Sequence, residues 1–276
     1  MHGTVVHLSL LRSTFMLRVS AMRGDEEAYR YLGIDESSPL SDVSHAIGVA
    51  FSLTGHHAAP AGFATDPGEP RPETRIDPDS TLGDALPGAR TTIYYHWGLW
   101  RFDLELVETY PRDDSTPPAV CVAGAGDFGT PLEITAINRA LLGDAIADAV
   151  LAEARPEVRN IVARSSMHDF VLLLKALDLN REVGADAEVR ASIRDLPLER
   201  TRAGRDAFWV AALALACLAD EETTDTIIAT TYSTLGYTGV PAVKVRELCS
   251  ASLGRLDVDR IPPVERLDVF RALLRG

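Results

Sequence analysis

The stretch at residues 91–108, TTIYYHWGLWRFDLELVE, constrains the fold more than any other part of the sequence. Its second half alternates strictly between apolar and polar side chains, which in an extended chain point to opposite faces. The apolar positions are Trp100, Phe102, Leu104 and Leu106. Thr91, Ile93 and Tyr95 repeat the alternation ahead of Gly98, where the chain can turn or bulge. The pattern predicts a β-hairpin with half-buried strands.

The residues before this hairpin predict further strands and one amphipathic helix. Segments rich in Val, Leu and Phe at 4–10, 14–22 and 28–34 are typical of strands, with a turn at 23–26. Apolar residues recur with helical spacing from Leu40 to Phe51, which predicts a helix closed by Gly55. The Pro- and Gly-rich segment 58–80 offers few apolar side chains, so a mobile loop is expected there. Residues 81–88 predict a short helical turn.

Beyond Pro131 the apolar residues recur every 3.6 positions instead of every two. Helices are predicted at 132–154, 158–179 with an interruption near 164–167, 186–196, 205–219, 223–235, 243–256 and 263–274. The segment 205–219 is apolar nearly all round, which predicts the buried centre of this half. The expected fold class is α+β: an N-terminal antiparallel sheet with a packed helix in residues 1–130, followed by an all-α C-terminal domain in residues 131–276.

Charge and cysteine content limit the expected partners and setting. The 276 residues include 27 basic and 40 acidic ones, a formal net charge of −13, so nucleic acid binding is possible only at a local basic patch. Cys121, Cys217 and Cys249 are far apart and form no CxxC pair, which favours a reducing, cytoplasmic setting. No apolar run approaches the ~20 residues of a membrane span. The segment 5–19 is interrupted by polar residues and predicts a strand rather than a signal peptide.

Four short motifs follow one another in the order found in a known family. They are LRV at residues 17–19, YRYL at 29–32, DVSHAIGVAF at 42–51 and YHWGLW at 95–100. In their order and spacing, residues 15–130 resemble the plasmid pRiA Orf-three-like family, whose members also occur as passenger proteins of mobile elements. CVAG at 121–124 looks like a shortened version of the family's Cys-x-x-Gly segment. The helical half, including residues 201–209, is similar to a C-terminal extension of some bacterial members.

The resemblance implies no activity, because none is established for the family. Where the family motif has aspartates, this chain has His96 and Leu99, and Phe102 stands where the family has a histidine. This chain therefore lacks those polar residues, and it would also lack any ligand binding or reaction that depends on them in the family. What the resemblance implies is an α+β N-terminal half in a bacterial protein associated with mobile elements.

No group of residues predicts catalysis, a metal centre or a cofactor. Histidines, a common type of metal ligand, occur at His45, His56, His57 and His96, but nothing in the sequence holds them together. The segment 124–129, GAGDFG, has the glycine content of a phosphate-binding loop. It lacks the GKS/T ending, and Asp127 would repel phosphate, so a tight turn between the domains is expected. We expect a protein without enzymatic activity.

The aromatic hairpin has two interpretations. By alternation, Trp100 is expected to be buried under the helix at 40–51, as part of an ordinary core. Tyr94, His96 and Trp97 are expected on the opposite face, with Trp97 the more exposed tryptophan. There they form a candidate binding site for a protein or peptide partner, because amphipathic rings are frequent at interfaces.

The densest basic run lies between residues 190 and 205. Its members are Arg190, Arg194, Arg200, Arg202 and Arg205. They predict either a helix-turn-helix fragment that contacts phosphates or a solvated face in which acidic residues interleave with the arginines. The leading hypothesis is a non-enzymatic binding or scaffold protein with an unknown protein or peptide partner. The alternative is a DNA-associated regulator or recombination accessory protein that acts through these arginines.

Overall fold

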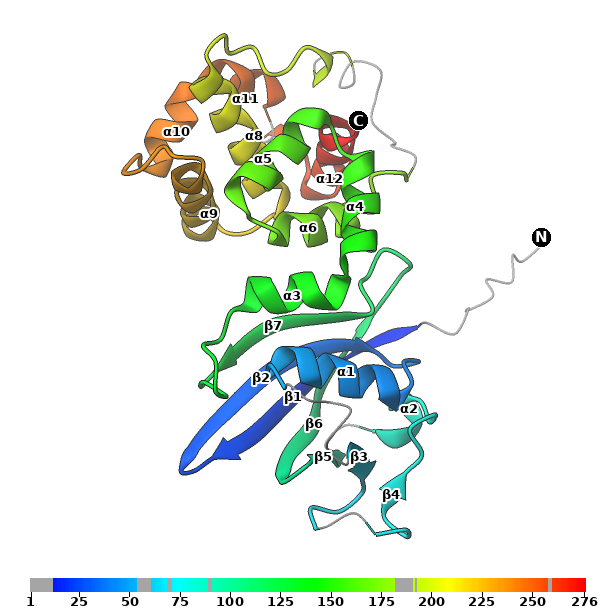
Figure 1. The fold of residues 1–276 in the computed structure, drawn as a ribbon. Coiled ribbons are helices and arrows are strands. Elements are labelled where there is room, and N and C mark those ends of the chain that lie inside the picture. The colour runs from blue at the N-terminus through cyan, green and yellow to red at the C-terminus, as the bar shows by residue number, and fades with distance from the viewer. Residues whose placement is uncertain are drawn as a thin grey trace, which may run out of the picture. The chain divides into compact units, whose positions relative to one another are not determined.

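The computed structural model of the protein describes residues 12–53, 61–68, 71–88, 91–181, 191, 193–257 and 260–276. Two compact units divide after Gly143, a sheet with helices and then a helical unit (Figure 1). The predicted class, an antiparallel sheet with a packed helix followed by a helical region, is confirmed. The strand predicted at 4–10, Gly55 and most of the helix predicted at 186–196 lie outside the described residues.

The first unit is built on an antiparallel sheet whose described strands run in the order β4-β3-β5-β6-β1-β2-β7. The strands are β1 Ser13–Arg23, β2 Glu26–Asp35, β3 Ala61–Ala64, β4 Arg75–Ile76, β5 Thr92–Trp97, β6 Trp100–Pro111 and β7 Ala119–Ala125. β1 with β2 and β5 with β6 form hairpins, and the pairing of β1 with β6 joins the two. Both predicted hairpins are therefore confirmed.

One face of this sheet is covered by helices (Figure 1). They are α1 Leu40–Ala50, α2 Leu82–Ala85 and α3 Ile134–Leu142. The apolar residues of β6 face them, as the alternation predicts, and Phe102 packs edge-on against Phe51, with ring centroids 4.9 Å apart. Phe51 caps the end of α1 by donating its backbone N–H to the Ile47 carbonyl, so the helix ends before Gly55.

A buried arginine connects three segments of the first unit. Arg30 on β2 is 2% exposed, and its guanidinium donates to backbone carbonyls at 2.8–3.2 Å. The acceptors belong to Tyr29, Ala50, Ala125 and Gly126. Burial lowers the pKa of Arg30, but an arginine stays protonated in a protein. A full positive charge is thus compensated by carbonyl dipoles and by the ring of Phe51, whose centroid lies 4.9 Å from the guanidinium carbon.

The glycines near the end of β7 allow it to lie close to β2. A Cβ added to Gly126, whose φ is +78°, would lie 2.5 Å from the carbonyl oxygen of Glu27. A Cβ on Gly124 would lie 2.7 Å from the carbonyl oxygen of Tyr29. The tight turn expected at 124–129 is therefore wrong for its first residues, which belong to a strand. Gly124 provides clearance from β2 and Arg30, whereas Gly126 and Gly129, both with positive φ, lie in the bends that follow β7.

The side chain of Asn138 joins α3 to β7. Asn138 is buried, its Oδ1 accepts the backbone N–H of Cys121 at 2.7 Å, and its Nδ2 donates to the carbonyl of Cys121 at 2.9 Å. Both backbone groups of one strand residue are thereby satisfied by a single amide. Although α3 follows the change to helical spacing at Pro131, it packs against the sheet and belongs to the first unit.

Three other predicted segments differ from the structure. The loop expected at 58–80 contains β3 and β4, which the alternation could not reveal because these strands are four and two residues long. The single helix predicted at 132–154 is broken at Gly143, whose φ of +77° cannot continue a helix. The helix predicted at 243–256 is divided at Cys249, whose backbone is not helical.

The second unit is helical throughout its described part. Its helices are α4 Asp144–Glu153, α5 Pro156–Ser165, α6 Asp169–Leu177, α8 Arg202–Ala216, α9 Glu221–Thr234, α10 Ala242–Leu248, α11 Ser250–Leu256 and α12 Pro263–Leu274. Every residue of α8 from Asp206 to Ala214 is buried, and the helix contacts α5, α9, α10 and α12. The prediction that this segment is the buried centre is confirmed, as is the interruption between α5 and α6.

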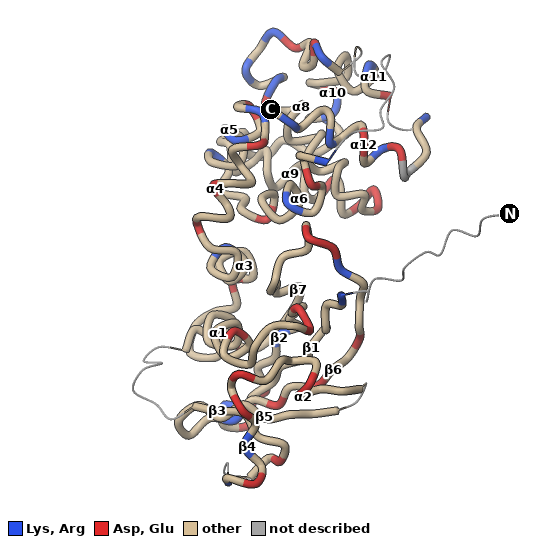
Figure 2. Tube along the Cα trace, turned by 90° about the vertical axis from the view of Figure 1, so that its right-hand side faces the viewer, with Lys and Arg blue, Asp and Glu red and all other residues tan. Residues whose placement is uncertain are grey.

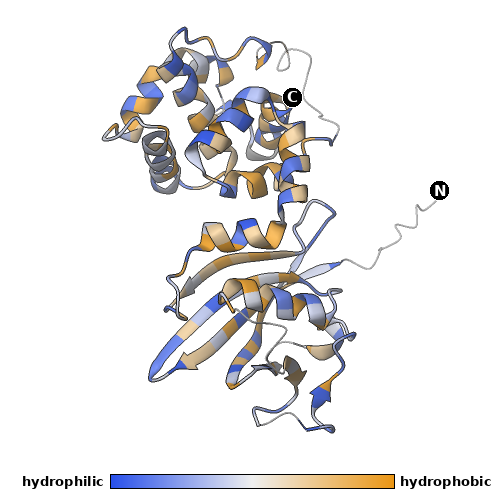
Figure 3. Cartoon of the chain, in the orientation of Figure 1, coloured by the Kyte–Doolittle hydropathy of each residue, from blue (hydrophilic) through white to orange (hydrophobic). Residues whose placement is uncertain are grey.

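The hydropathy of the residues differs between the elements of the first unit. Figure 3 shows that β7 and α3 are largely apolar, whereas the tip of the β1–β2 hairpin is hydrophilic. Among the described residues, no helix combines the length and the apolar character that a membrane crossing requires.

Candidate functional site

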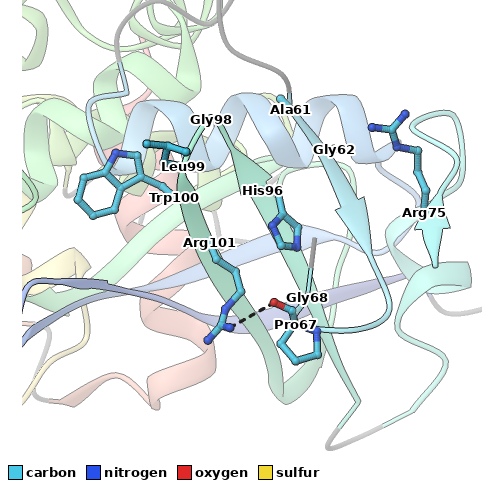
Figure 4. Close-up of a pocket in the computed structure, with 10 residues that line it drawn as sticks. All are labelled: Ala61, Gly62, Pro67, Gly68, Arg75, His96, Gly98, Leu99, Trp100 and Arg101. Atoms are coloured by element: carbon cyan, nitrogen blue, oxygen red, sulfur yellow. Dashed lines mark hydrogen bonds between the residues drawn. The ribbon is translucent and has the colours of Figure 1, made fainter. Parts of the chain in front are cut away.

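The tip of the β5–β6 hairpin borders a cavity of about 340 Å³ (Figure 4). β3, β4 and the residues that follow β3 form its other wall. The lining residues are Ala61, Gly62, Pro67, Gly68, Arg75, His96, Gly98, Leu99, Trp100 and Arg101. Segments far apart in the sequence meet here because β3 pairs with β5, which places Gly62 opposite His96.

His96 and Arg101 lie side by side on the sheet face opposite α1. They are directly paired in the β5–β6 register, and Arg101 donates to the carbonyl of Pro67 at 3.3 Å (Figure 4). Arg101 also pairs with Asp103 at 2.8 Å and lies over the ring of Tyr94, 5.6 Å from its centroid. These contacts hold the guanidinium at the cavity wall.

The surroundings of His96 favour its uncharged form. Burial lowers the pKa of His96, and the positive charge of Arg101 lowers it further, while Asp66 and Asp103 act in the opposite direction. The Nε2 atom is shielded from solvent and has no hydrogen-bond partner among the described residues. The imidazole therefore offers a neutral polar group beside the cavity.

The cavity wall is locally positive. Two arginines, Arg75 and Arg101, are among the lining residues, and those residues include no carboxylate. The ion pair of Arg101 with Asp103 is partly exposed and only partly offsets this charge. On a chain with a net charge of −13, this is a place where an anionic group is favoured.

A second cavity lies on the other side of the same turn. It measures about 330 Å³ and shares Leu99, Trp100 and Arg101 with the first. Its remaining lining residues are Ser20, Ala21, Met22, Glu27 and Asp103. Leu99 itself is fully exposed, at 104%, and Met22 is more than half exposed. We call Met22, Arg75, His96, Leu99, Trp100 and Arg101 the hairpin-tip surface.

The structure separates the three residues predicted as a binding site. Tyr94 and His96 lie on the face opposite α1, as expected, but only His96 lines the cavity. Trp97 pairs with Trp100 and packs with it against the core, so its expected place on the opposite face is wrong. Only Gly98 and Leu99 separate the two strands, so Trp97 and Trp100 are directly opposite each other and lie on one face. The role of all three residues in binding stays a prediction.

The cavity also uses residues that the sequence did not predict as part of a site. Leu99 and Arg75 are the important ones, because they supply exposed apolar surface and positive charge. A leucine after the glycine of a tight hairpin turn has no neighbour to pack against. That signal was present in the sequence for Leu99, but the position of Arg75 depends on the pairing of β4 with β3.

Replacing Trp97 or Trp100 by alanine should destabilise the first unit to a similar extent. Both are partly buried and packed against the core, so we expect about 2–3 kcal/mol for each, somewhat below the ~3–5 of a fully buried tryptophan. Chemical denaturation of the two variants measures this. Leu99→Ala is the control and should change stability by less than about 0.5 kcal/mol. A silent Trp97→Ala variant would place Trp97 away from the core.

The arginines of the basic run are spread over a helical segment that contains Arg194, the loop with Arg200 and the start of α8. Arg190 lies outside the described residues, whereas Arg194, Arg200, Arg202 and Arg205 are exposed. Acidic residues interleave with them along the trace (Figure 2). Because α8 is buried beyond its first turn, it has no free face to enter a DNA groove as a recognition helix does. Phosphate contact by the exposed arginines stays a prediction.

The described residues show neither a metal site nor an activated thiol. No group of three or more histidine, cysteine or acidic side chains gathers among them, and His56 and His57 lie outside them. Burial raises the pKa of Cys121 and Cys217, and it raises that of Cys249 to about 12. These thiols are protonated at neutral pH and are poor nucleophiles.

No family model matches the chain, and no curated protein matches it. Among solved structures, a protein of unknown function from Methanosarcina mazei Go1, MM3350, is similar to part of it. The two are 15% identical with a TM-score of 0.35, over 51% of this chain and 89% of the other. A similarity at this level supports no inference about function. The resemblance to the plasmid pRiA Orf-three-like family stays a prediction.

Proposed function

We propose that this protein is a non-enzymatic binding protein that engages a protein or peptide partner through the hairpin-tip surface. The observation that carries the proposal is the exposed Leu99, which stands between two cavities at the end of the sheet. Covering a leucine side chain is worth about 2 kcal/mol, so a partner gains most by placing an apolar group there.

The charges at this surface define the partner further. A carboxylate of the partner can pair with Arg101 and Arg75, and such charge-assisted hydrogen bonds are the strong ones. An apolar residue beside that carboxylate can cover Leu99 and the edge of Trp100. The expected partner is thus an acidic segment with a neighbouring apolar side chain.

The cellular setting belongs to the same proposal. The motif order at residues 17–19, 29–32, 42–51 and 95–100 supports a bacterial scaffold linked to mobile elements, and the three widely spaced cysteines support a cytoplasmic setting. The second candidate function is DNA association through Arg194, Arg200, Arg202 and Arg205, which is supported by the exposure of these side chains. Binding of that kind weakens steeply with salt, and the duplex titration described below measures it.

Selection of random peptides displayed on phage tests the leading proposal. The wild-type protein should enrich peptides in which Asp or Glu stands next to an apolar residue. Leu99→Asp and Arg75→Gln should each weaken binding of a selected peptide by about tenfold or more. Leu99→Asp removes one buried apolar contact, and Arg75→Gln removes one charge-assisted hydrogen bond. Val243→Asp, at an exposed apolar residue of α10, is the matched control and should retain binding.

Two results would contradict the proposal. The first is a peptide population that Leu99→Asp enriches as well as the wild type does. The second is turnover of a hydrolase or nuclease substrate that is lost when a lining residue such as His96 is replaced, since this would make the cavity an active site.

A further inference from the structure

A larger cavity, of about 460 Å³, lies within the helical unit. One side of α5 and the first two turns of α8 form its walls, and Pro197 from the loop before α8 also lines it. The lining residues are Pro156, Glu157, Asn160, Ile161, Arg164, Pro197, Arg202, Arg205, Asp206 and Trp209. Six of these ten residues are polar or charged, so the cavity has both an apolar and a charged part.

The ion pairs at this cavity leave positive charge available. Arg164 forms two hydrogen bonds with the carboxylate of Asp206, at 2.9 and 2.7 Å, and Tyr237 donates to the same carboxylate at 3.0 Å. Arg202 is 71% exposed and lies 3.9 Å from that carboxylate. Arg205 is exposed and has no ion-pair partner among the described residues. Three guanidinium groups therefore face two carboxylates, those of Asp206 and Glu157.

The two helices add to this positive potential. α5 begins at Pro156 and has no side-chain cap, so the backbone N–H groups of its first turn are open to an acceptor. α8 begins at Arg202, and Thr201 caps it by accepting the N–H of Gly204. Helix starts carry partial positive charge, and both lie at the wall of one cavity.

Trp209 supplies an independent indication of a ligand. Its side chain is 2% exposed and lines the cavity, and its Nε1–H has no acceptor among the described residues. A buried donor without an acceptor is costly, so a shift of the indole that lets an oxygen in the cavity accept this N–H would be favourable. The indole, Ile161 and the two prolines also provide apolar surface for the body of a ligand.

We infer that this cavity binds a small organic anion, an apolar or aromatic body that carries a phosphate or a carboxylate. The anionic group pairs with Arg205 and Arg202, one of its oxygens accepts the Nε1–H of Trp209, and the body lies against Ile161 and the indole. This site lies in the second unit and does not depend on the function proposed for the hairpin-tip surface.

Indole NMR of the full chain labelled with ¹⁵N-tryptophan tests this inference. The signal of Trp209 is assigned with Trp209→Phe, and the signals of Trp97 and Trp100 serve as internal controls. Titration with phenyl phosphate or benzoate should shift the Trp209 signal in a saturable way, and the stronger of the two identifies the anionic group. Phenol has the same ring without the charge and should bind at least about tenfold more weakly.

Variants separate this site from the DNA hypothesis. Arg205→Gln should weaken the better ligand by about tenfold or more, whereas Arg200→Gln, an exposed arginine that does not line the cavity, should leave its affinity within about twofold. A random duplex is titrated at two salt concentrations in parallel. The inference is overturned if neither anion shifts Trp209, if phenol binds equally well, or if duplex binds and both variants weaken it alike. The last result would favour backbone phosphate contact by the whole basic run.

Discussion

Replacing Gly126 by alanine is expected to destabilise the first unit by about 3–5 kcal/mol, because backbone strain and a steric clash add. The backbone φ of +78° is one that other residues rarely adopt, and the new Cβ would lie 2.5 Å from the Glu27 carbonyl oxygen and 2.8 Å from the Ala28 Cα. Both neighbours are backbone atoms of β2, so neither can rotate away. Chemical denaturation followed by circular dichroism measures the loss.

Gly24→Ala is the matched control for this variant. Gly24 also has a positive φ, of +65°, but a Cβ there meets nothing within 4 Å. It should therefore cost only the backbone strain of about 1–2 kcal/mol. If Gly126→Ala costs no more than Gly24→Ala, then β7 does not approach β2 as closely as described.

The second large effect is expected for Arg30→Met, which should destabilise the first unit by about 3–5 kcal/mol. Methionine retains much of the apolar stem but removes every donor, so four backbone carbonyls lose a bond, three of them to the same nitrogen. The attraction to the ring of Phe51 is lost as well. The free energy of unfolding, extrapolated from urea denaturation, measures the effect.

Arg18→Met provides the comparison on the opposite face of the same sheet. Arg18 is partly exposed and pairs with Glu27 at 2.8 Å, so its loss should cost about 1 kcal/mol or less. If Arg30→Met is neutral or stabilising, the free energy lost by burying the Arg30 charge is at least as large as the free energy gained from its hydrogen bonds to the carbonyls.

The parts of the fold that could be predicted are those with a long, uninterrupted pattern. The alternation in β6 covers enough residues to identify both the strand and its buried face, and the nearly uniform apolar character of α8 identifies a central helix. Periodicity works in these elements because each residue's environment repeats along the element. Turn signals at Gly24 and Gly98 then place the hairpins.

What could not be predicted depends on contacts between residues far apart in the sequence. In the sequence, the end of β7 looks like a turn because it is rich in glycine. These glycines are required by the close approach of the β2 backbone, which lies about 100 residues earlier in the chain. Arg30 is a basic residue within a strand, and nothing near it in the sequence indicates burial. At the candidate site, His96 was singled out from the hairpin itself, whereas Arg75 reaches the cavity only through the pairing of β4 with β3.

The pairing of Asn138 with Cys121 has a consequence for how the sheet meets other molecules. β7 is the last strand in the sheet order, and an unpaired outer strand can recruit a strand from another copy of the chain. The amide of Asn138 occupies both hydrogen-bonding groups of Cys121 on that strand. At the other end of the order, β4 is two residues long and too short to hold an added strand firmly. Among the described strands, an added strand would meet an occupied position at Cys121 of β7 and a very short partner in β4, and both oppose growth of the sheet by strand addition.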